Sequence, residues 1–192
     1  MRALPNNAED QLGAAISALG SDDFAARLYE WLHRSFEIDN TTMLAYFQTR
    51  RPQVLFSQTR VAAVHENIES DYVSGAYLLD PFHELHVDRV QEGLYRLRDF
   101  APDQFHRNEY FASYYRRTTM IDEIAYVAYP AEGVSVHVCL GRDASSGRYF
   151  SPRDLSTAQR MSAITCGLIR KQWQGLSSSG DYTDVALVER LR

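Results

Sequence analysis

The sequence predicts one α/β (α+β) domain in which a central, largely antiparallel sheet of five or six strands is flanked by helices. Two pairs of β-like runs lie so close together that each pair predicts a hairpin: 41–47 with 53–57, around QTRRP, and 122–129 with 133–141, around PAEG. Hairpins pair their strands antiparallel. Helical periodicity around these pairs supplies the flanking layers, and 192 residues suit a single domain with a sizeable core.

Helical patterns fill the N-terminal part of the chain. Residues 8–19 fit a short helix. Ser21 and the two aspartates after it then predict a helix start, with a capping hydroxyl and acids in the first turn. The apolar residues that follow share one helical face: Phe24, Leu28, Trp31, Leu32 and Phe36. Residues 64–79 fit a further helix that ends before Asp80, whose carboxylate either caps the turn, as we expect from its chemistry, or points into a cavity.

Shorter elements occupy the middle of the chain. We expect a histidine-rich turn or helix at 82–90 and a strand at 93–97. Asp103 then starts a helix that carries the aromatic cluster 105–115. In the second hairpin, valines and Leu140 alternate with Ser135, His137 and Cys139, which is the pattern of a strand with two unlike faces.

A long helix over 152–173 closes the domain. Ser151 is its expected cap, Pro152 takes the first helical position and Asp154 the capping-box position. Its packed face is expected to hold Met161, Ile164 and Leu168. We therefore place one domain at 1–174, followed at 175–192 by a linker (GLSSSG) and an amphipathic segment (DVALVERLR).

Composition and motifs exclude several functions. A net charge of −5 and a pI of about 5.7 argue against a nucleic-acid binder in this chain taken alone. No apolar run approaches the roughly 20 residues of a membrane span, and the start of the chain lacks the apolar region of a secretory signal. Two cysteines are far from a disulfide framework, so we expect a cytoplasmic protein. The sequence holds no GxSxG, P-loop, GxGxxG or CxxC motif, so we expect no enzyme and no cofactor.

The stretch 109–129, EYFASYYRRTTMIDEIAYVAY, crowds aromatic side chains beside both signs of charge. One interpretation is a ligand pocket, in which aromatic walls and carboxylates bind a cationic amine, or the arginine pair binds an anion. The other is packing of a helix on the sheet, with the charges in a solvated rim. The ligand-binding candidates are Tyr77, Tyr95, Tyr110, Tyr114, Tyr115, Asp122, Tyr126 and His137.

Strand alternation bears on two of these candidates. Asp122 and Tyr126 share a strand face with Ile124. If Ile124 faces the core, the other two side chains face the same way, which is natural for a polar cavity and awkward for a dry core.

Histidines and cysteines raise two further interpretations. His83 and His86 are spaced to share a metal, but the HExxH spacing and an evident third ligand are lacking, so we expect surface histidines and no metal. His137 and Cys139 either line the floor of the cavity or pack against the last helix, which carries Cys166. A redox contact between the cysteines is conceivable, but free cysteines are usually inert core residues.

Several stretches between residues 25 and 173 carry a family resemblance: GAYLLDPF, GLYRLRDFAPDQF, EYFASYYRR, the DEI that opens the strand at 122, VSVHVCLGR and FSPRDL. With these landmarks the chain resembles the N-terminal sensor region of LuxR-type helix-turn-helix transcriptional regulators, the subset with a GAF/PAS-like effector domain. The resemblance implies a GAF/PAS-like fold, a small-molecule effector and DNA binding only through a C-terminal helix-turn-helix that is absent from this chain.

From the residues and the resemblance together we expect a ligand-sensing domain that binds a small metabolite, with a weak preference for a cationic amine, and signals through the helix 152–173. That helix and residues 24–36 offer an interface for a homodimer, since two-fold dimers are the commonest assembly. The chain is then either truncated or a solitary sensor. Two alternatives stay open: a small cytoplasmic enzyme that uses the same cavity, and an interaction module with no ligand.

Overall fold

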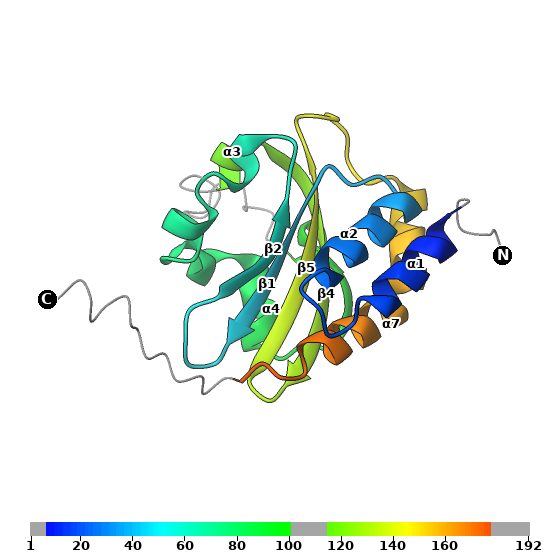
Figure 1. Cartoon of the computed structure of the whole chain (residues 1–192). Helices are drawn as coiled ribbons and strands as arrows, with labels where there is room; N and C mark the ends of the chain where they lie inside the picture. Colours follow the sequence, from blue (N-terminus) through cyan, green and yellow to red (C-terminus); the bar gives the residue numbers. More distant parts are fainter. Residues whose placement is uncertain (1–6, 101–114, 178–192) are drawn as a thin grey trace, which may run out of the picture.

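A five-stranded antiparallel sheet forms the centre of the fold (Figure 1). The computed structural model describes residues 7–100 and 115–177. The strands are β1 (Asn40–Phe47), β2 (Gln53–Gln58), β3 (Gly93–Arg96), β4 (Met120–Ala131) and β5 (Val134–Asp143), in the order β2-β1-β5-β4-β3. All neighbours pair antiparallel. The predicted fold class and both predicted hairpins are confirmed.

Helices cover both faces of the sheet, as Figure 1 shows for the labelled ones. One face carries α1 (Ala8–Ser17), α2 (Phe24–Ser35) and α7 (Pro152–Trp173). The other carries shorter pieces: α3 (Ala62–His65), η1 (Ile68–Tyr72), η2 (Ala76–Leu79), α4 (Pro81–Val87), α5 (Leu97–Phe100) and η4 (Tyr115–Thr118). Within the part of the chain that the structure describes, no helix combines the length and apolarity that crossing a membrane requires.

The two faces of the sheet differ in chemistry. On β5, Val134, Val136, Val138 and Leu140 belong to the larger core, beneath α2 and α7. Ser135, His137 and Cys139 point to the opposite face. Strand β4 follows the same division, because Ile124 pairs with Leu140 while Val127 pairs with His137. The first face is therefore largely aliphatic, while the second, which we call the polar face, combines polar groups with a second apolar core around Tyr46, Phe82 and Leu85.

The apolar face of α2 is confirmed, but it lies inside the domain. Phe24, Leu28, Trp31 and Leu32 have no solvent exposure and pack within the domain. A homodimer through residues 24–36 and 152–173 stays a prediction. The predicted cap is wrong, because the Ser21 hydroxyl donates to the carbonyl oxygen of Ala18 and no side chain caps α2.

Helix α7 begins with the predicted capping box. Ser151 Oγ accepts from the Asp154 N–H at 3.2 Å, Asp154 accepts from the Ser151 N–H at 2.9 Å, and Pro152 takes the first position. Of the three predicted packing residues, Met161 and Leu168 are buried, while Ile164 is 48% exposed and its prediction is wrong. The buried stripe also contains Ala158, Thr165 and Ile169.

The predicted helix over 64–79 is broken into three short pieces. They are α3, the π-helical turn η1 and the 3-10 turn η2. Gly75 separates the last two with an extended backbone. Asn, Ser, Asp and Gly are abundant here and stabilise helices poorly, so local propensity offers little resistance to tertiary packing. The irregular backbone faces the polar side of the sheet.

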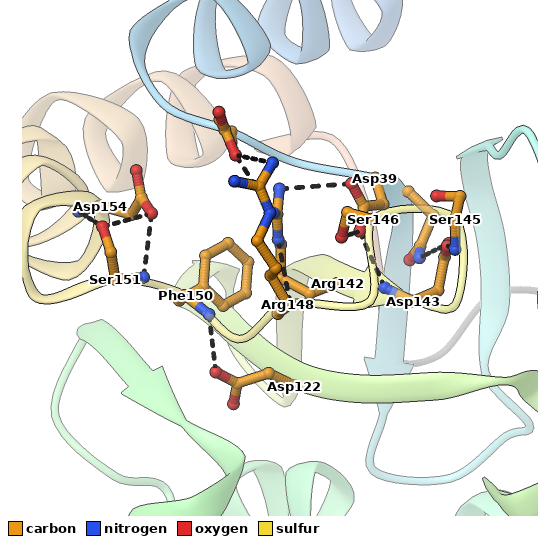
Figure 2. A network of polar contacts seen from close by, with 12 residues as sticks. Asp39, Asp122, Arg142, Asp143, Ser145, Ser146, Arg148, Phe150, Ser151 and Asp154 are labelled. Atoms are coloured by element: carbon orange, nitrogen blue, oxygen red, sulfur yellow. Dashed lines mark hydrogen bonds and ion pairs between the residues drawn. The ribbon is translucent and has the colours of Figure 1, made fainter.

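A polar network fixes the connection between β5 and α7 (Figure 2). The buried Arg142 guanidinium pairs with Asp39 at 3.3 Å and with Glu37 at 3.2 Å, and it donates to the carbonyl of Arg148. Asp122, whose side chain has no exposure, pairs with Arg96 at 2.7 Å and accepts from the Phe150 N–H at 3.0 Å. The network therefore holds the loop 144–150 at both ends.

We predict that Asp122→Ala lowers the free energy of unfolding by about 3 kcal/mol, because it leaves a cation and a buried N–H without their partner. Asp122→Asn should cost less, since its amide oxygen still accepts from Phe150. Urea unfolding measures both, with Asp22→Ala at an exposed position as the control. A loss below 1 kcal/mol for Asp122→Ala would contradict the role assigned to this carboxylate.

Candidate functional site

The polar face of the sheet contains a small cavity of about 50 Å³. Its floor comes from β1, β4 and β5, and its cover from the broken segment 62–80 and from η4. Its lining combines carboxyl, hydroxyl, imidazole and amide groups with a few apolar side chains: Asn40, Thr42, Leu44, Val64, His65, Ile68, Tyr72, Asp80, Thr118, Met120, Glu123 and Cys139. Such convergence of polar groups is typical of binding sites.

Two carboxyl groups line this cavity. Asp80 caps α4, as predicted, by accepting from the Phe82 N–H at 2.9 Å, and its other oxygen accepts from the Tyr72 hydroxyl at 2.5 Å. Glu123 has no hydrogen-bond partner for its carboxyl group among the described residues. Burial, with the nearby charges of Asp80 and Asp122, raises the pKa of Glu123 well above its ordinary value. Glu123 therefore keeps its proton to a higher pH than an ordinary glutamate does.

Further residues of the lining make polar contacts of their own. Thr42 Oγ1 and His65 Nε2 are 2.8 Å apart, and burial lowers the pKa of His65 to about 4. Asn40 donates to Asp143 Oδ2 at 2.7 Å. A side chain at Gly141 would collide with Asn40 and Met120, so glycine is required for this close approach.

A cluster of aromatic rings adjoins the cavity. The Tyr46 ring packs against His137, His83 and His86, with centroids 4.7, 5.3 and 5.9 Å away, and its hydroxyl is hydrogen-bonded to that of Tyr72. Ser135 Oγ lies 2.7 Å from His86 Nδ1 and 3.0 Å from His137 Nε2.

The expectation of surface histidines is wrong for His86, which is buried. Burial lowers its pKa to about 4, and burial together with His86 and His83 lowers the pKa of His137 well below the ordinary value. Both imidazoles are therefore neutral near pH 7. His137 Nδ1 has no partner among the described residues.

A second, larger cleft of about 950 Å³ lies on the other side of this cluster. It is lined by the turn between β1 and β2, by residues 77–92 and by the tip of the β4–β5 hairpin. Tyr77 and His83 stand edge to face in its wall, with centroids 5.0 Å apart. Arg50, Arg51 and Arg89 also line this cleft.

The structure brings together only some of the predicted ligand-binding residues. Tyr77 and His137 both belong to the aromatic cluster around His83 and Tyr46. The Tyr95 hydroxyl donates to the Gln91 carbonyl at 2.5 Å. Tyr95 packs against the apolar cluster of Leu44, Phe82 and Leu85 and lines neither cavity. Tyr110 and Tyr114 lie outside the described residues, as does the side chain of Tyr115.

Asp122 and Tyr126 lie on the opposite face from both cavities. The Tyr126 hydroxyl donates to the Ala158 carbonyl at 2.9 Å within the core against α7, and Asp122 pairs with Arg96. The expectation that their strand face borders a polar cavity is wrong, because these two polar groups are satisfied inside the packed layer. Ligand contact by any of the eight candidates stays a prediction.

Of the candidates whose side chains the structure describes, none is among the residues that line the small cavity. The polar lining residues that the sequence interpretation missed include Thr42, His65, Tyr72 and Glu123. A signal was present for Glu123. The valine-rich face of 134–140 must pair with the aliphatic face of its neighbour, which places Ile124 beside Leu140 and Glu123 on the side of Cys139. His137 and Asp122 therefore could not share a cavity.

Two alternatives lose their basis. Among residues 7–100 and 115–177, no group of three or more His, Cys, Asp or Glu is placed to hold a metal ion. The sheet separates the two cysteines, because Cys139 lines the small cavity while Cys166 lies on α7 with its thiol toward the Val127 carbonyl. Burial raises the pKa of both thiols, so neither is an activated nucleophile.

No protein-family model and no curated protein sequence matches the chain. Several solved structures share its fold, among them the following three. The ligand-binding domain of VqsR from Pseudomonas aeruginosa is 22% identical, with a TM-score of 0.75 over 90% of this chain and 99% of that one. CepR2 from Burkholderia cenocepacia, an N-acylhomoserine-lactone-dependent LuxR-family transcriptional factor, is 14% identical, with a TM-score of 0.53 over 84% and 87%. SdiA from Escherichia coli is 10% identical, with a TM-score of 0.54 over 96% and 78%.

We predict that the free energy of unfolding falls as the pH drops from about 6.5 to 4. His65 and His86 have folded-state pKa values of about 4, so the unfolded chain binds more protons in this window, and their contribution is complete above it. Each such histidine contributes a slope of about 1.4 kcal/mol per pH unit. Urea unfolding at several pH values should show a slope that is shallower in His86→Gln than in the parent chain.

The raised pKa of Glu123 makes the fold more stable as the pH falls, which opposes the effect of the histidines. Glu123 is present in both the parent chain and His86→Gln, so its contribution cancels when their slopes are compared. Equal slopes in the parent and the variant would show that His86 is not held neutral.

Proposed function

We propose that this chain is the ligand-sensing domain of a LuxR-type transcriptional regulator, and that its effector is a small metabolite bound on the polar face of the sheet. One observation carries the proposal: two carboxyl groups, Asp80 and Glu123, converge with Tyr72, His65 and Thr42 on one cavity. The fold shared with the VqsR ligand-binding domain supports it.

A binding role accounts for the placement of Glu123. The Glu123 residue is half-buried, and a carboxyl group partly removed from water is stabilised by a hydrogen-bond donor. Among the described residues nothing pairs with the Glu123 carboxyl group, which lines the cavity. A ligand with hydrogen-bond donors would supply the missing partner.

The ligand group that fits this cavity is a cation. Asp80 already accepts two hydrogen bonds, from Tyr72 and from the Phe82 backbone, as a carboxylate does. An ammonium group would let Glu123 ionise beside it through a charge-assisted hydrogen bond. A cavity of about 50 Å³ holds little more than one water-sized group, for which the share of liquid volume is about 30 Å³. The described cavity therefore suits a small amine or the cationic head of a larger effector.

The enzyme alternative has less support. Ser135 and His137 are both fully buried, and the neighbouring thiol of Cys139 is buried with a raised pKa. A nucleophile needs an adjacent base and access to a substrate. Of the three proteins of like fold, one is described as a ligand-binding domain, another as a transcriptional factor and none as an enzyme.

Signalling would run through the connection to α7. Asn40 lines the cavity and donates to Asp143, which adjoins Arg142 in the network that holds the loop before α7 (Figure 2). A ligand can switch this connection only through different affinities for two of its arrangements. A GAF/PAS-like classification, a homodimer and a DNA-binding unit beyond this chain belong to the same proposal.

We expect butylamine to raise the melting temperature and to bind with measurable heat, while butanol and butyrate do not. Glu123→Gln should weaken amine binding by roughly 10- to 100-fold, the loss of a charge-assisted hydrogen bond of about 1.5–3 kcal/mol. Calorimetry at several pH values in buffers of different ionisation heat should show proton release below the pKa of Glu123 in the free protein, because the amine displaces its proton. Affinity should therefore rise with pH through this range.

Glu132→Gln is the matched control, since Glu132 is an exposed glutamate of the same hairpin that lines the larger cleft instead. Equal weakening by both substitutions would place the amine elsewhere. Binding without proton release would contradict the role of a protonated Glu123, and consumption of the compound would favour an enzyme.

A further inference from the structure

The larger cleft has no part in the proposed function. Its wall on η2 and α4 exposes two apolar side chains, Leu78 at 61% and Val87 at 63%. Exposed apolar side chains that gather at a hollow rimmed by charges mark an interaction site. Three arginines, Arg50, Arg51 and Arg89, and two glutamates, Glu92 and Glu132, line the cleft. Arg51 and Arg89 are exposed, while Glu92 is paired with Arg170, so basic groups outnumber the remaining acidic one.

The described chain ends beside this cleft. After α7 the backbone turns, with the Leu176 N–H donating to the Trp173 carbonyl at 3.0 Å. The Arg50 guanidinium then donates to the carbonyl of Ser177 at 3.4 Å. Figure 1 shows this last stretch, in red, beside the ends of the two hairpins. Ser177 therefore lies next to Arg50, one of the residues that line the cleft.

The sequence that follows complements the cleft. Residues 178–192 read SSGDYTDVALVERLR, in which Asp181 and Asp184 precede the apolar run VALV. Two acidic groups match the arginines of the rim, and the apolar run matches Leu78 and Val87. Four residues of extended chain reach about 13 Å, which lets Asp181 bridge from Ser177 into the cleft.

We propose that residues 178–192 dock in the larger cleft of their own chain. Asp181 and Asp184 pair with Arg51 and Arg89, and the apolar run covers Leu78 and Val87. The larger cleft thereby binds the segment that follows α7 in the chain. The two cavities share no lining residue, so this contact goes beyond the proposed function.

The test places a nitroxide label on Arg192→Cys and measures paramagnetic relaxation of backbone amides in the full chain, without effector. The native cysteines are buried and escape labelling. The amides of Leu78 and Val87 should relax strongly, and that of Ser156, at the start of α7, should not. Charge reversal by Arg51→Glu with Arg89→Glu should reduce the enhancement at Leu78 and Val87 at least fivefold. Adding Asp181→Arg with Asp184→Arg should restore it.

Arg27→Glu is the matched control, because Arg27 is an exposed arginine of α2 on the opposite face of the sheet. Leu78→Ser with Val87→Ser tests the apolar contact at exposed positions, where melting temperatures should show that the fold is intact. The proposal would be overturned if the paramagnetic relaxation enhancement at Leu78 and Val87 were unchanged by the charge reversal. An enhancement that increased with protein concentration would show docking between chains instead of within one chain. Amine binding is measured separately in the same samples, so failure of this proposal is distinguishable from failure of the sensor proposal.

Discussion

The pairing register between β4 and β5 is the constraint on which the rest of the structure depends. Ile124 lies opposite Leu140, and Val127 lies opposite His137. A slip of one residue would exchange the two faces of either strand. The register therefore keeps an unbroken aliphatic surface beneath α2 and α7, and it sends Glu123, His137 and Cys139 to the side that holds the cavities.

Polar groups on that second side impose their own requirements on the backbone that covers them. Tyr72 and Asp80 must point inward to complete a hydrogen-bonded chain with Tyr46. A regular helix over 64–79 would distribute side chains at its own period instead. The observed turns, with a break at Gly75, contain fewer regular helical hydrogen bonds than one continuous helix would. In return they place Tyr72 and Asp80 toward the cavity. Irregular backbone here is thus a product of the cavity chemistry.

Elements with local signals could be predicted from the sequence, and this covers most of the fold. The capping box of Ser151 and Asp154 and both hairpins depend on residues near each other in the chain. The site depends on distant partners. Alternation separates Asp122 from Glu123 but does not say which one meets the core, and the aliphatic partner strand decides it. The breaks within 62–80 follow from tertiary packing, which a pattern of single residues does not encode.

Tyr46 has a position whose consequence reaches both cavities. Its ring touches His83 and His86, which line the larger cleft, while its hydroxyl holds Tyr72 in the wall of the small cavity. One rigid side chain thus belongs to two surfaces. If an occupant of one surface moves this ring and thereby changes the affinity of the other surface, the second occupant changes the affinity of the first surface by the same factor. This follows because linkage between binding sites is reciprocal.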